Sequence, residues 1–366
     1  MIPLFKVHMP PREHLLPSLE QVLYSGYITQ GEKVQEFEER LGYVFGTPNV
    51  LTVNSGTSSL QLALRLAGIR GGEVITTPMT CSATVLPVLA EGAVPVWADV
   101  DPYSGNIDPD DVAARVTADT RAILAVHWGG QPCDMRPLMS IGRHYDIPVV
   151  IDAAHALGAQ WLGSSIALQA DFTCYSLQAI KHITTGDGGI LVTGNAEDCK
   201  RGKRLRWFGL DRNSQGGDAR VDNDIPEWGY KFHMNDIAAT IGLAQLHYLS
   251  YIVGRHRDNA AYYDSVLRVG RQEMPSEANG AWWLYTLLWE DGSQRAHFAE
   301  YMKREDIQVS RVHSRLDQLT CFREFSNGPL PGVDSFFERE ICIPVHWGIT
   351  PDVREKIAES VNRFCG

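Results

Sequence analysis

The stretch from Val149 to Gly189 decides the fold: VVIDAAHALGAQWLGSSIALQADFTCYSLQAIKHITTGDGG. It opens with an apolar run that ends at Asp152, and a glycine-rich turn follows Lys181 near its close. A continuous apolar run, as opposed to an alternating one, is typical of a strand that is buried on both faces. An acidic side chain at the end of such a strand lies where α/β proteins gather their chemistry. The stretch therefore predicts a parallel or mixed sheet with a site at its edge.

Short apolar runs and helical repeats alternate on both sides of this stretch. Phe37, Leu41 and Phe45 recur at helical spacing, and Leu60 begins a second repeat of the same kind. Apolar runs typical of buried strands occupy residues 74–77, 94–99, 121–127, 148–152 and 189–193. Strands interleaved with helices predict an α/β protein with a central sheet that is mixed and mostly parallel.

The order of predicted helices and strands changes near residue 250. One long helical stretch, from about Asn235 to Leu267, precedes two further strand-like runs at 282–291 and 340–346. A last amphipathic helix closes the chain, with Val353, Ile357, Val361 and Phe364 on one face. We therefore expect a large domain over residues 1–250 and a smaller C-terminal α+β domain over residues 251–366.

Composition excludes several classes of protein. The 44 acidic residues outnumber the 33 lysines and arginines, and the net charge of -11 disfavours binding to nucleic acid. Seven scattered cysteines without a C-x-x-C pair argue against disulfides or a zinc module and favour a reducing compartment. No apolar run is long enough for a signal peptide or a membrane span. We expect a cytoplasmic protein with no nucleic-acid or membrane partner and, because the histidines lack ligand spacing, no metal site.

Three features of the sequence together predict a site for pyridoxal phosphate. Lys181 would form a Schiff base with the cofactor, and Asp152 would keep the pyridine nitrogen protonated so that the ring accepts electrons. The run Asn54-Ser55-Gly56-Thr57-Ser58, just before a predicted helix, offers backbone N–H groups and hydroxyls to a phosphate.

Each of these features also has a simpler structural interpretation. A strand-end aspartate often caps a helix or forms an ion pair, and a lysine is usually solvated at the surface. The serines and threonine before a helix are more often an N-cap than an anion site, and the glycines after Lys181 are equally typical of a hairpin turn. Only the order and spacing of all three favour the functional interpretation.

Many ordered segments resemble the DegT/DnrJ/EryC1/StrS family of sugar aminotransferases. The resemblance covers nearly the whole chain and is carried by SGYITQGEKVQEFE at 25–38, NSGTSSLQLAL at 54–64, TPMTCSAT at 77–84, GAVPVWADVDPYSGNIDP at 92–109, HWGGQPCDM at 127–135, IDAAHALGA at 151–159, SLQAIKHITTGDGG at 176–189 and GYKFHMNDIAATIGLAQL at 229–246. It implies an aspartate aminotransferase-like fold of type I and pyridoxal 5'-phosphate as the cofactor.

The resemblance assigns roles to the residues at the matching positions. It implies that Lys181 bonds covalently to the cofactor and later moves a proton between the substrate carbon and the cofactor carbon. It places Asp152 at the pyridinium nitrogen and His155 near the phenolic oxygen. The cofactor phosphate would be held by Gly56, Thr57 and Ser176.

The chain departs from the family pattern at three places. Cys81 stands where relatives carry an aromatic ring over the cofactor, and a thiol offers less stacking contact. Lys231 replaces an asparagine that in relatives reaches the cofactor phosphate of the neighbouring subunit, and we expect it to act there as a point charge. Ile180 replaces the asparagine that relatives carry just before the lysine. We interpret these departures as marks of a subgroup.

The resemblance implies an enzyme that moves an amino group from L-glutamate, or less favourably L-glutamine, to a nucleotide-linked keto sugar. It also implies a homodimer with shared active sites. Two alternatives stay open at this point: a nucleotide-sugar dehydratase on the same scaffold, and a non-catalytic pyridoxal phosphate-binding regulatory protein. The dehydratase branch carries histidine in place of the Schiff-base lysine, so Lys181 favours amino transfer.

Further residues are candidates for contact with the sugar nucleotide. We expect Tyr27, Thr29, Trp128 and His313 to line the substrate cleft, although structural packing is an equally good interpretation for the first three. A basic run is a weaker candidate for the substrate diphosphate, because a solvated helix face explains most of its members: Lys200, Arg201, Lys203, Arg204, Arg206 and Arg212.

Overall fold

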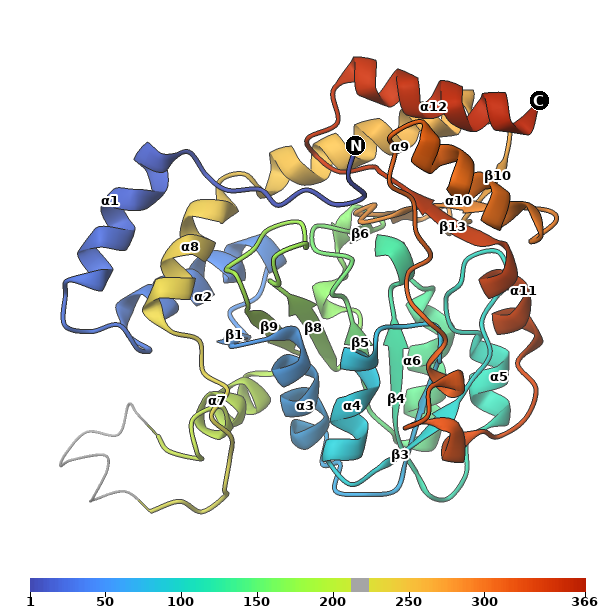
Figure 1. Ribbon diagram of the computed structural model, residues 1–366. Coiled ribbons are helices and arrows are strands. Elements are labelled where there is room, and N and C mark those ends of the chain that lie inside the picture. The colour runs from blue at the N-terminus through green and yellow to red at the C-terminus, as the bar shows by residue number, and fades with distance from the viewer. Residues whose placement is uncertain (212–223) are drawn as a thin grey trace.

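A seven-stranded sheet lies at the centre of the computed structural model, which describes residues 1–211 and 224–366 (Figure 1). Its strands, in spatial order, are β1 (Val50–Val53), β9 (Gly189–Thr193), β8 (Phe172–Ser176), β5 (Val149–Asp152), β4 (Thr120–Val126), β2 (Glu73–Thr76) and β3 (Val94–Trp97).

The directions of the strands confirm the predicted fold class. The five strands from β8 to β3 run parallel to one another, whereas β9 is antiparallel to both of its neighbours, β8 and β1. The sheet is therefore mixed and mostly parallel. Side chains along β5 are all buried, as a continuous apolar run predicts for a strand that is covered on both faces.

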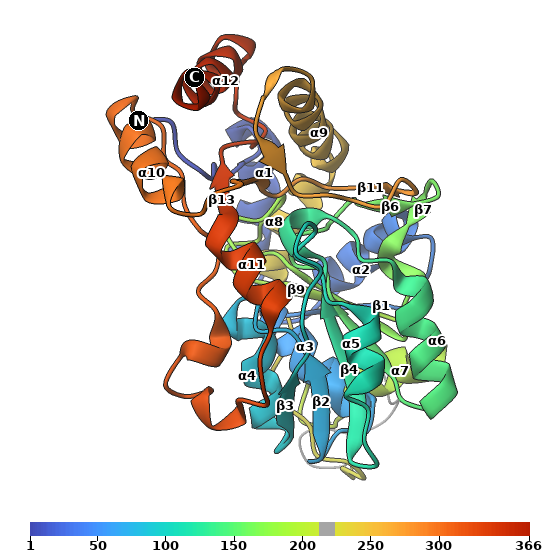
Figure 2. The ribbon, with the colours of Figure 1, turned by 90° about the vertical axis from the view of Figure 1, so that its right-hand side faces the viewer.

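Helices cover both faces of this sheet (Figures 1 and 2). In chain order the helices of the first 250 residues are α1 (Arg12–Leu23), α2 (Glu32–Phe45), α3 (Gly56–Leu66), α4 (Ser82–Ala90), α5 (Pro109–Ala114), α6 (Met135–Tyr145), α7 (Ala196–Leu205) and α8 (Asp236–Leu246). Alternate residues of β5 enter different cores: Val149 and Ile151 pack with Phe37 of α2, and Val150 packs with Leu62 of α3. The two faces of one strand thus bury two separate sets of helices.

A second layer of structure is built from the C-terminal third of the chain. Its antiparallel sheet has the order β10 (Gly270–Arg271), β12 (Tyr285–Leu288) and β13 (Glu340–Ile343). It packs with α9 (Leu249–Val266), α10 (Gln294–Arg304) and α12 (Pro351–Cys365) around a core that includes Tyr263, Phe298 and Val361. The remaining elements are α11 (Pro331–Arg339), β6 (Gln160–Trp161), β7 (Ser164–Ser165), β11 (Ala278–Asn279) and short 3-10 turns at Trp128–Gly130, Ile166–Leu168, Leu316–Gln318 and Arg323–Phe325.

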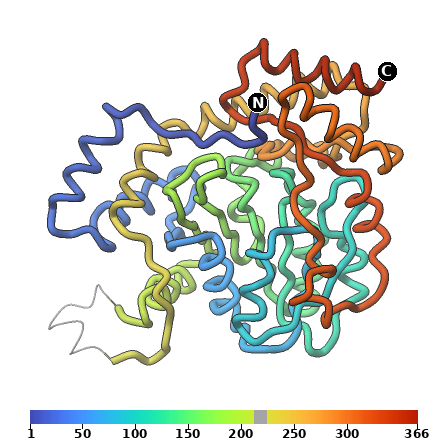
Figure 3. The backbone as a smooth tube through the Cα atoms, in the orientation of Figure 1, coloured from blue at the N-terminus to red at the C-terminus, as the bar shows by residue number. Residues whose placement is uncertain are grey.

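The N-terminal segment joins this second layer. Ile2 forms an isolated parallel β-bridge with Ile307, and the N–H of Leu4 donates to the side chain of Gln308 at 3.0 Å. Figure 3 shows the N-terminus beside the C-terminal elements of the chain. The second layer is thus assembled from both ends of the sequence.

The expected long helix over 235–267 is two helices. α8 and α9 are bent by 57° at a break of two residues, His247 and Tyr248. The bend sends Leu249 and Val253 into the core of the large sheet and Tyr263 into the core of the second layer. Within the described residues no single helix is long and apolar enough to cross a membrane, and only this bent pair meets the length and composition together.

Candidate active site

Asp152 ends β5 and is fixed there by two hydrogen bonds. Thr84 Oγ1 donates to its Oδ2 at 2.7 Å, and the backbone N–H of Ala154 donates to its Oδ1 at 2.9 Å. Burial raises the pKa of the Asp152 carboxyl above its usual value, and the two hydrogen bonds and the charge of Lys181 offset only part of that rise. A positive charge brought to this carboxylate would stabilise its ionised form further, so the position suits the partner of a buried cation.

Lys181 lies in the turn after β8, within the electrostatic reach of Asp152 and Cys81. Burial lowers the pKa of its ammonium to about 8, and the two acidic neighbours oppose that change. A fraction of the amine is therefore free base near neutral pH. The free base is the form in which a lysine attacks an aldehyde or accepts a proton.

Aromatic rings from distant parts of the chain meet beside Lys181, and we call them the ring cluster: Trp128, His155, Trp283 and His313. The Lys181 Nζ lies 3.9 Å from the ring centroid of Trp283. That indole stacks on His155 with centroids 3.8 Å apart, and His155 lies 5.8 Å from His313 in a nearly parallel arrangement. Trp128 presents its ring edge-on to both histidines at 6.3 and 6.2 Å.

Both histidines of the ring cluster have lowered pKa values, which favours the neutral imidazole near pH 7. Burial and the charge of Lys181 hold the pKa of His155 well below its usual range, and burial lowers that of His313 to about 4. The buried atoms His155 Nδ1 and His313 Nε2 have no hydrogen-bond partner among residues 1–211 and 224–366. A buried polar atom without a hydrogen-bond partner costs free energy, so a ligand that makes a hydrogen bond to it would be stabilised there.

The residues predicted to bind phosphate lie at the N-terminus of α3, and we call this place the cup. Ser55 caps the helix by accepting a hydrogen bond from the N–H of Ser58 at 3.0 Å, and Ser58 Oγ donates to Asn54 at 2.7 Å. The cap does not use the N–H groups of Gly56 and Thr57, which belong to the first turn. The positive end of the helix dipole and these N–H groups favour an anion at this place.

Ser176 closes the cup from the end of β8. A β-carbon added to Gly56 would lie 2.9 Å from Ser176 Cβ, so only glycine permits the approach of α3 to this strand. Ser176 Oγ accepts from the N–H of Gln178 at 3.2 Å, which leaves its own hydroxyl proton to donate. β5 and β8 are neighbours in the sheet, with Asp152 opposite Cys174. The cup and the Asp152 carboxylate therefore share one edge of the sheet.

Two of the three departures from the family pattern, Cys81 and Lys231, occupy different settings. Cys81 is half-buried just before α4 and acts on the charge of Lys181. Lys231 is exposed, and its carbonyl accepts from Asn54 Nδ2 at 3.3 Å. Its backbone thus lies at the edge of the cup while its side chain extends into solvent.

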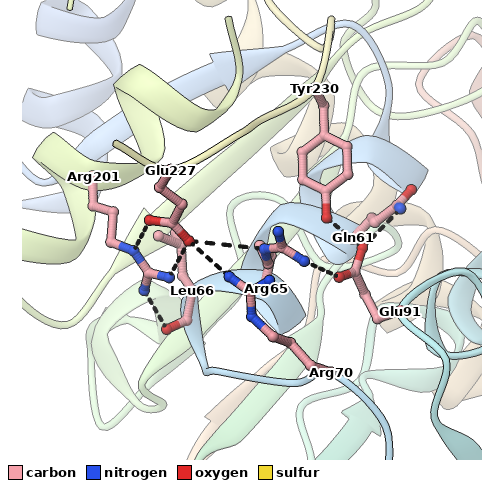
Figure 4. Close-up of polar contacts among 8 residues, drawn as sticks. All are labelled: Gln61, Arg65, Leu66, Arg70, Glu91, Arg201, Glu227 and Tyr230. Atoms are coloured by element: carbon pink, nitrogen blue, oxygen red, sulfur yellow. Dashed lines mark hydrogen bonds and ion pairs between the residues drawn. The ribbon is translucent and has the colours of Figure 1, made fainter. Parts of the chain in front are cut away.

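Glu227 and Tyr230, which follow residues 212–223, belong to a polar network with side chains of α3 and α7 (Figure 4). Arg201 makes two hydrogen bonds of 2.8 Å to the carboxylate of Glu227, and Arg65 pairs with both Glu227 and Glu91. Tyr230 donates to the same Glu91. The network fixes the backbone just ahead of Lys231 and so places that lysine beside the cup.

The basic run is largely engaged in structural ion pairs. Lys203 and Arg206 both pair with Glu38, and Arg201 belongs to the network of Figure 4. Arg212 lies outside the described residues. For the three paired members the interpretation as structural charges fits better than contact with a diphosphate.

Tyr27 and Thr29 lie in the loop between α1 and α2, apart from the ring cluster. Tyr27 is 79% exposed. Thr29 Oγ1 lies 3.4 Å from His233 Nε2, and its carbonyl accepts from the N–H of Asp236, the first residue of α8. The structure thus gathers Trp128 and His313 in the ring cluster, whereas Thr29 contacts His233 and Asp236 and Tyr27 stands largely exposed.

Sequence reasoning missed two residues of this site, Thr84 and Trp283. Both belonged to segments already noted, TPMTCSAT and WWLYTLLWED, but no local signal marks one threonine or one tryptophan as a contact of Asp152 or Lys181. Only the fold brings them there, from 68 residues away for Thr84 and 103 residues away for the Trp283–Ile180 contact.

The residues present fit pyridoxal phosphate. The Lys181 amine, with its lowered pKa, suits the aldehyde of the cofactor, and the buried Asp152 carboxylate suits the ring nitrogen. The N-terminus of α3, which only a glycine at position 56 allows so close to Ser176, suits the phosphate. Across the described part of the chain, no group of three or more His, Cys, Asp or Glu side chains converges as a metal site would require.

Comparison with known proteins agrees with this geometry. The profile of the DegT/DnrJ/EryC1/StrS aminotransferase family matches residues 11–362. The spore coat polysaccharide biosynthesis protein SpsC of Bacillus subtilis is 30% identical, over 96% of this chain and 97% of its own.

Solved structures superpose on nearly the whole chain. The sugar aminotransferase CalS13 of Micromonospora echinospora is 38% identical with a TM-score of 0.94, covering 99% of this chain and 100% of its own. The PLP form of the Streptococcus pneumoniae protein Spr1654 is 27% identical with a TM-score of 0.89, covering 98% of both chains. The family match and these similarities, which extend over the cup, Asp152 and Lys181 alike, mean that the chain belongs to the DegT/DnrJ/EryC1/StrS aminotransferase family.

Proposed function

We propose that this protein is a pyridoxal phosphate-dependent aminotransferase that moves an amino group from L-glutamate to a nucleotide-linked keto sugar. One observation carries the proposal: Lys181, with an amine pKa of about 8, lies within the electrostatic reach of the buried Asp152, at the sheet edge where α3 offers its N-terminus. The names of relatives, a sugar aminotransferase and a polysaccharide biosynthesis protein, support a sugar as the amino acceptor.

Each residue of the site has one task in this proposal. Bound pyridoxal phosphate supplies an electron sink for the carbon that loses its proton. Lys181 holds the cofactor covalently at rest and, once released, takes and returns that proton through its Nζ. Asp152, held by Thr84, faces the ring nitrogen as a carboxylate. Gly56, Thr57 and Ser176 bind the phosphate, with His155 as a neutral imidazole near the phenolic oxygen.

Trp128 and His313 are proposed to line the cleft for the sugar. They lie next to His155, and His313 has a buried nitrogen that is open to a ligand's hydrogen bond. Cys81, within the electrostatic reach of Lys181, is proposed to pack against the cofactor ring where relatives use an aromatic side chain.

We propose that the working protein is a cytoplasmic homodimer with a large domain over 1–250 and a small domain over 251–366. Large apolar side chains stand exposed around α1 and α2, which supports a protein partner there: Tyr24 is 85%, Tyr27 79% and Tyr43 84% exposed. In the dimer, Tyr27, Thr29 and Lys231 would serve the site of the neighbouring subunit. Sedimentation that finds an active monomer would contradict this part of the proposal.

The function is tested by following the transferred nitrogen atom with an isotope label. The purified protein, loaded with pyridoxal phosphate, receives L-glutamate labelled with ¹⁵N and a panel of nucleotide-linked keto sugars, and the products are analysed by mass spectrometry. We expect ¹⁵N on a sugar and the appearance of 2-oxoglutarate, with neither in Lys181→Ala. The alternatives give different products: a dehydratase removes water without adding nitrogen, and a regulatory cofactor-binding protein leaves every sugar unchanged. Labelled L-glutamine in a parallel reaction identifies the donor.

A further inference from the structure

Trp283 makes two contacts with the loop that carries Lys181. Its indole N–H donates to the carbonyl of Ile180 at 2.9 Å, and its ring lies beneath the Lys181 Nζ at 3.9 Å. One contact holds the backbone next to the lysine and the other holds its charged end. A single buried side chain therefore fixes both ends of Lys181.

The indole itself is held firmly in place. It stacks on His155 at 3.8 Å and on Phe5 of the N-terminal segment at 4.7 Å, with interplanar angles of 18° and 23°. The backbone around it is tied to the turn at Trp128–Gly130, because the N–H of Leu284 donates to the carbonyl of Gly129 at 3.1 Å. Trp283 is thus a fixed platform, and the lysine is the part that moves.

Lys181 must occupy two positions if the proposed function holds, and this inference rests on that function. It is bonded to the cofactor at rest and must leave when an incoming amine takes its place. The structure places the Lys181 Nζ over the face of Trp283. We propose that Trp283 is a positioning residue that holds the Lys181 ammonium while the lysine is not bonded to the cofactor.

The exchange that releases the lysine conserves atoms and charge. Overall, an incoming primary ammonium gives up two protons and its nitrogen bonds to the cofactor carbon as the bond from that carbon to the Lys181 nitrogen breaks. The Lys181 nitrogen takes up two protons and leaves as an ammonium, and the carbon–nitrogen linkage is protonated before and after. No oxidant and no water are consumed. A tryptophan face attracts the ammonium formed in this step more strongly than phenylalanine does, and an aliphatic side chain does not attract it in this way. Trp283 therefore shifts the exchange toward the released lysine.

The test measures this exchange without turnover. Protein loaded with pyridoxal phosphate is titrated with methylamine, and borohydride reduction followed by peptide mass spectrometry gives the fraction of cofactor still bonded to Lys181. For Trp283→Leu we expect the methylamine concentration that releases half of the cofactor to rise by roughly 2- to 30-fold, the range of a cation–π contact. For Trp283→Phe we expect a smaller rise in the same direction.

Trp347 provides a matched control. Its indole N–H also donates to a backbone carbonyl, that of Lys6 at 2.9 Å, and the Lys6 Nζ lies 5.1 Å from its ring centroid. Trp347→Leu removes the same kind of contacts around a different lysine, and we expect it to release Lys181 at the wild-type methylamine concentration.

The outcomes separate the two proposals. A Trp283→Leu protein that releases its lysine at the wild-type concentration or below it contradicts the platform role, because a merely loosened site releases the cofactor more readily. If that variant does not fold, Trp283→Phe decides, and an unchanged midpoint overturns the inference. Wild-type protein that never carries the cofactor on Lys181 overturns the proposed function instead.

Discussion

Thr84 Oγ1 donates a hydrogen bond of 2.7 Å to Oδ2 of Asp152 and so joins α4 to the end of β5. Burial raises the pKa of this carboxyl above its usual value, and the bond from Thr84 offsets part of that rise. The N–H of Ala154 donates to Oδ1, so each carboxylate oxygen of Asp152 accepts one hydrogen bond. Thr84, a side chain that sequence reasoning did not single out, therefore favours the ionised form of the carboxylate on which the proposed chemistry depends.

Removal of that donor should weaken cofactor binding. In Thr84→Val the pKa of Asp152 rises further, and the loss of a hydrogen bond to a charged group costs about 1.5–3 kcal/mol. We expect the dissociation constant for pyridoxal phosphate to increase roughly tenfold or more, measured by equilibrium dialysis. Thr173→Val is the control, because the buried Thr173 Oγ1 has no hydrogen-bond partner among the described residues. Equal affinities for the two variants would contradict the role of Thr84.

Asp152→Asn should separate attachment from turnover. Asparagine keeps the shape of the side chain but removes the charge that would hold the ring nitrogen protonated. We expect borohydride still to trap the cofactor on Lys181, whereas amino transfer slows by roughly 10³- to 10⁴-fold, the scale on which a misplaced catalytic partner acts. An unchanged rate in a stopped-flow assay would remove Asp152 from the mechanism.

The reactivity of Lys181 should follow its lowered pKa. Burial moves the ammonium pKa down from 10.5 to about 8, so the amine is mostly free base above pH 8 and mostly protonated below it. In the cofactor-free protein we expect the rate of acetylation of Lys181, followed by brief labelling and mass spectrometry, to level off above that pH and to fall tenfold for each pH unit below it. Exposed Lys200 serves as the internal comparison. A midpoint above pH 10 for Lys181 would contradict the buried position.

The phosphate cup should fail selectively when Gly56 acquires a side chain. The new β-carbon of Gly56→Ala meets Ser176 Cβ at 2.9 Å, so α3 must move away from β8 at a cost of about 1–3 kcal/mol. We expect the affinity for pyridoxal phosphate to fall by roughly tenfold or more, and that for pyridoxal, which lacks the phosphate, to change little.

Gly254→Ala is the control for that change. Gly254 lies within α9, where an added β-carbon has nothing within 4 Å, and we expect it to leave both affinities unaltered. An equal loss for pyridoxal and pyridoxal phosphate in Gly56→Ala would show that the helix does not serve the phosphate.

The parts of the fold that depend on local pattern were predictable from the sequence. The continuous apolar runs at β5 and β4 identify buried parallel strands, and their order with the helices gives the α/β class. The pattern does not identify β1, because Thr52 interrupts its short apolar run. In the structure Thr52 is fully buried, and its N–H donates to the Glu38 carboxylate. The break between α8 and α9 was also missed, because no glycine or proline stands at His247 or Tyr248 to mark it.

The candidate site divides in the same way. Lys181, Asp152 and the residues of the cup belong to ordered motifs, so the sequence alone singles them out as candidates. Trp283 depends on contacts between distant segments, and the same indole in another fold would be an ordinary core residue. Tyr27 and Thr29 show the reverse, since their motif is clear but neither belongs to the ring cluster, and Thr29 contacts His233 and Asp236 instead.

The absorption spectrum during a titration with L-glutamate tests the central claim most directly. Protein mixed with pyridoxal phosphate should be yellow, because the cofactor is bonded to Lys181, and the colour should fade as glutamate delivers its amino group to the cofactor and 2-oxoglutarate appears. Lys181→Ala should not acquire the lysine-bound colour. A wild-type protein that binds no pyridoxal phosphate, or one whose yellow colour is unchanged by glutamate, would contradict the account.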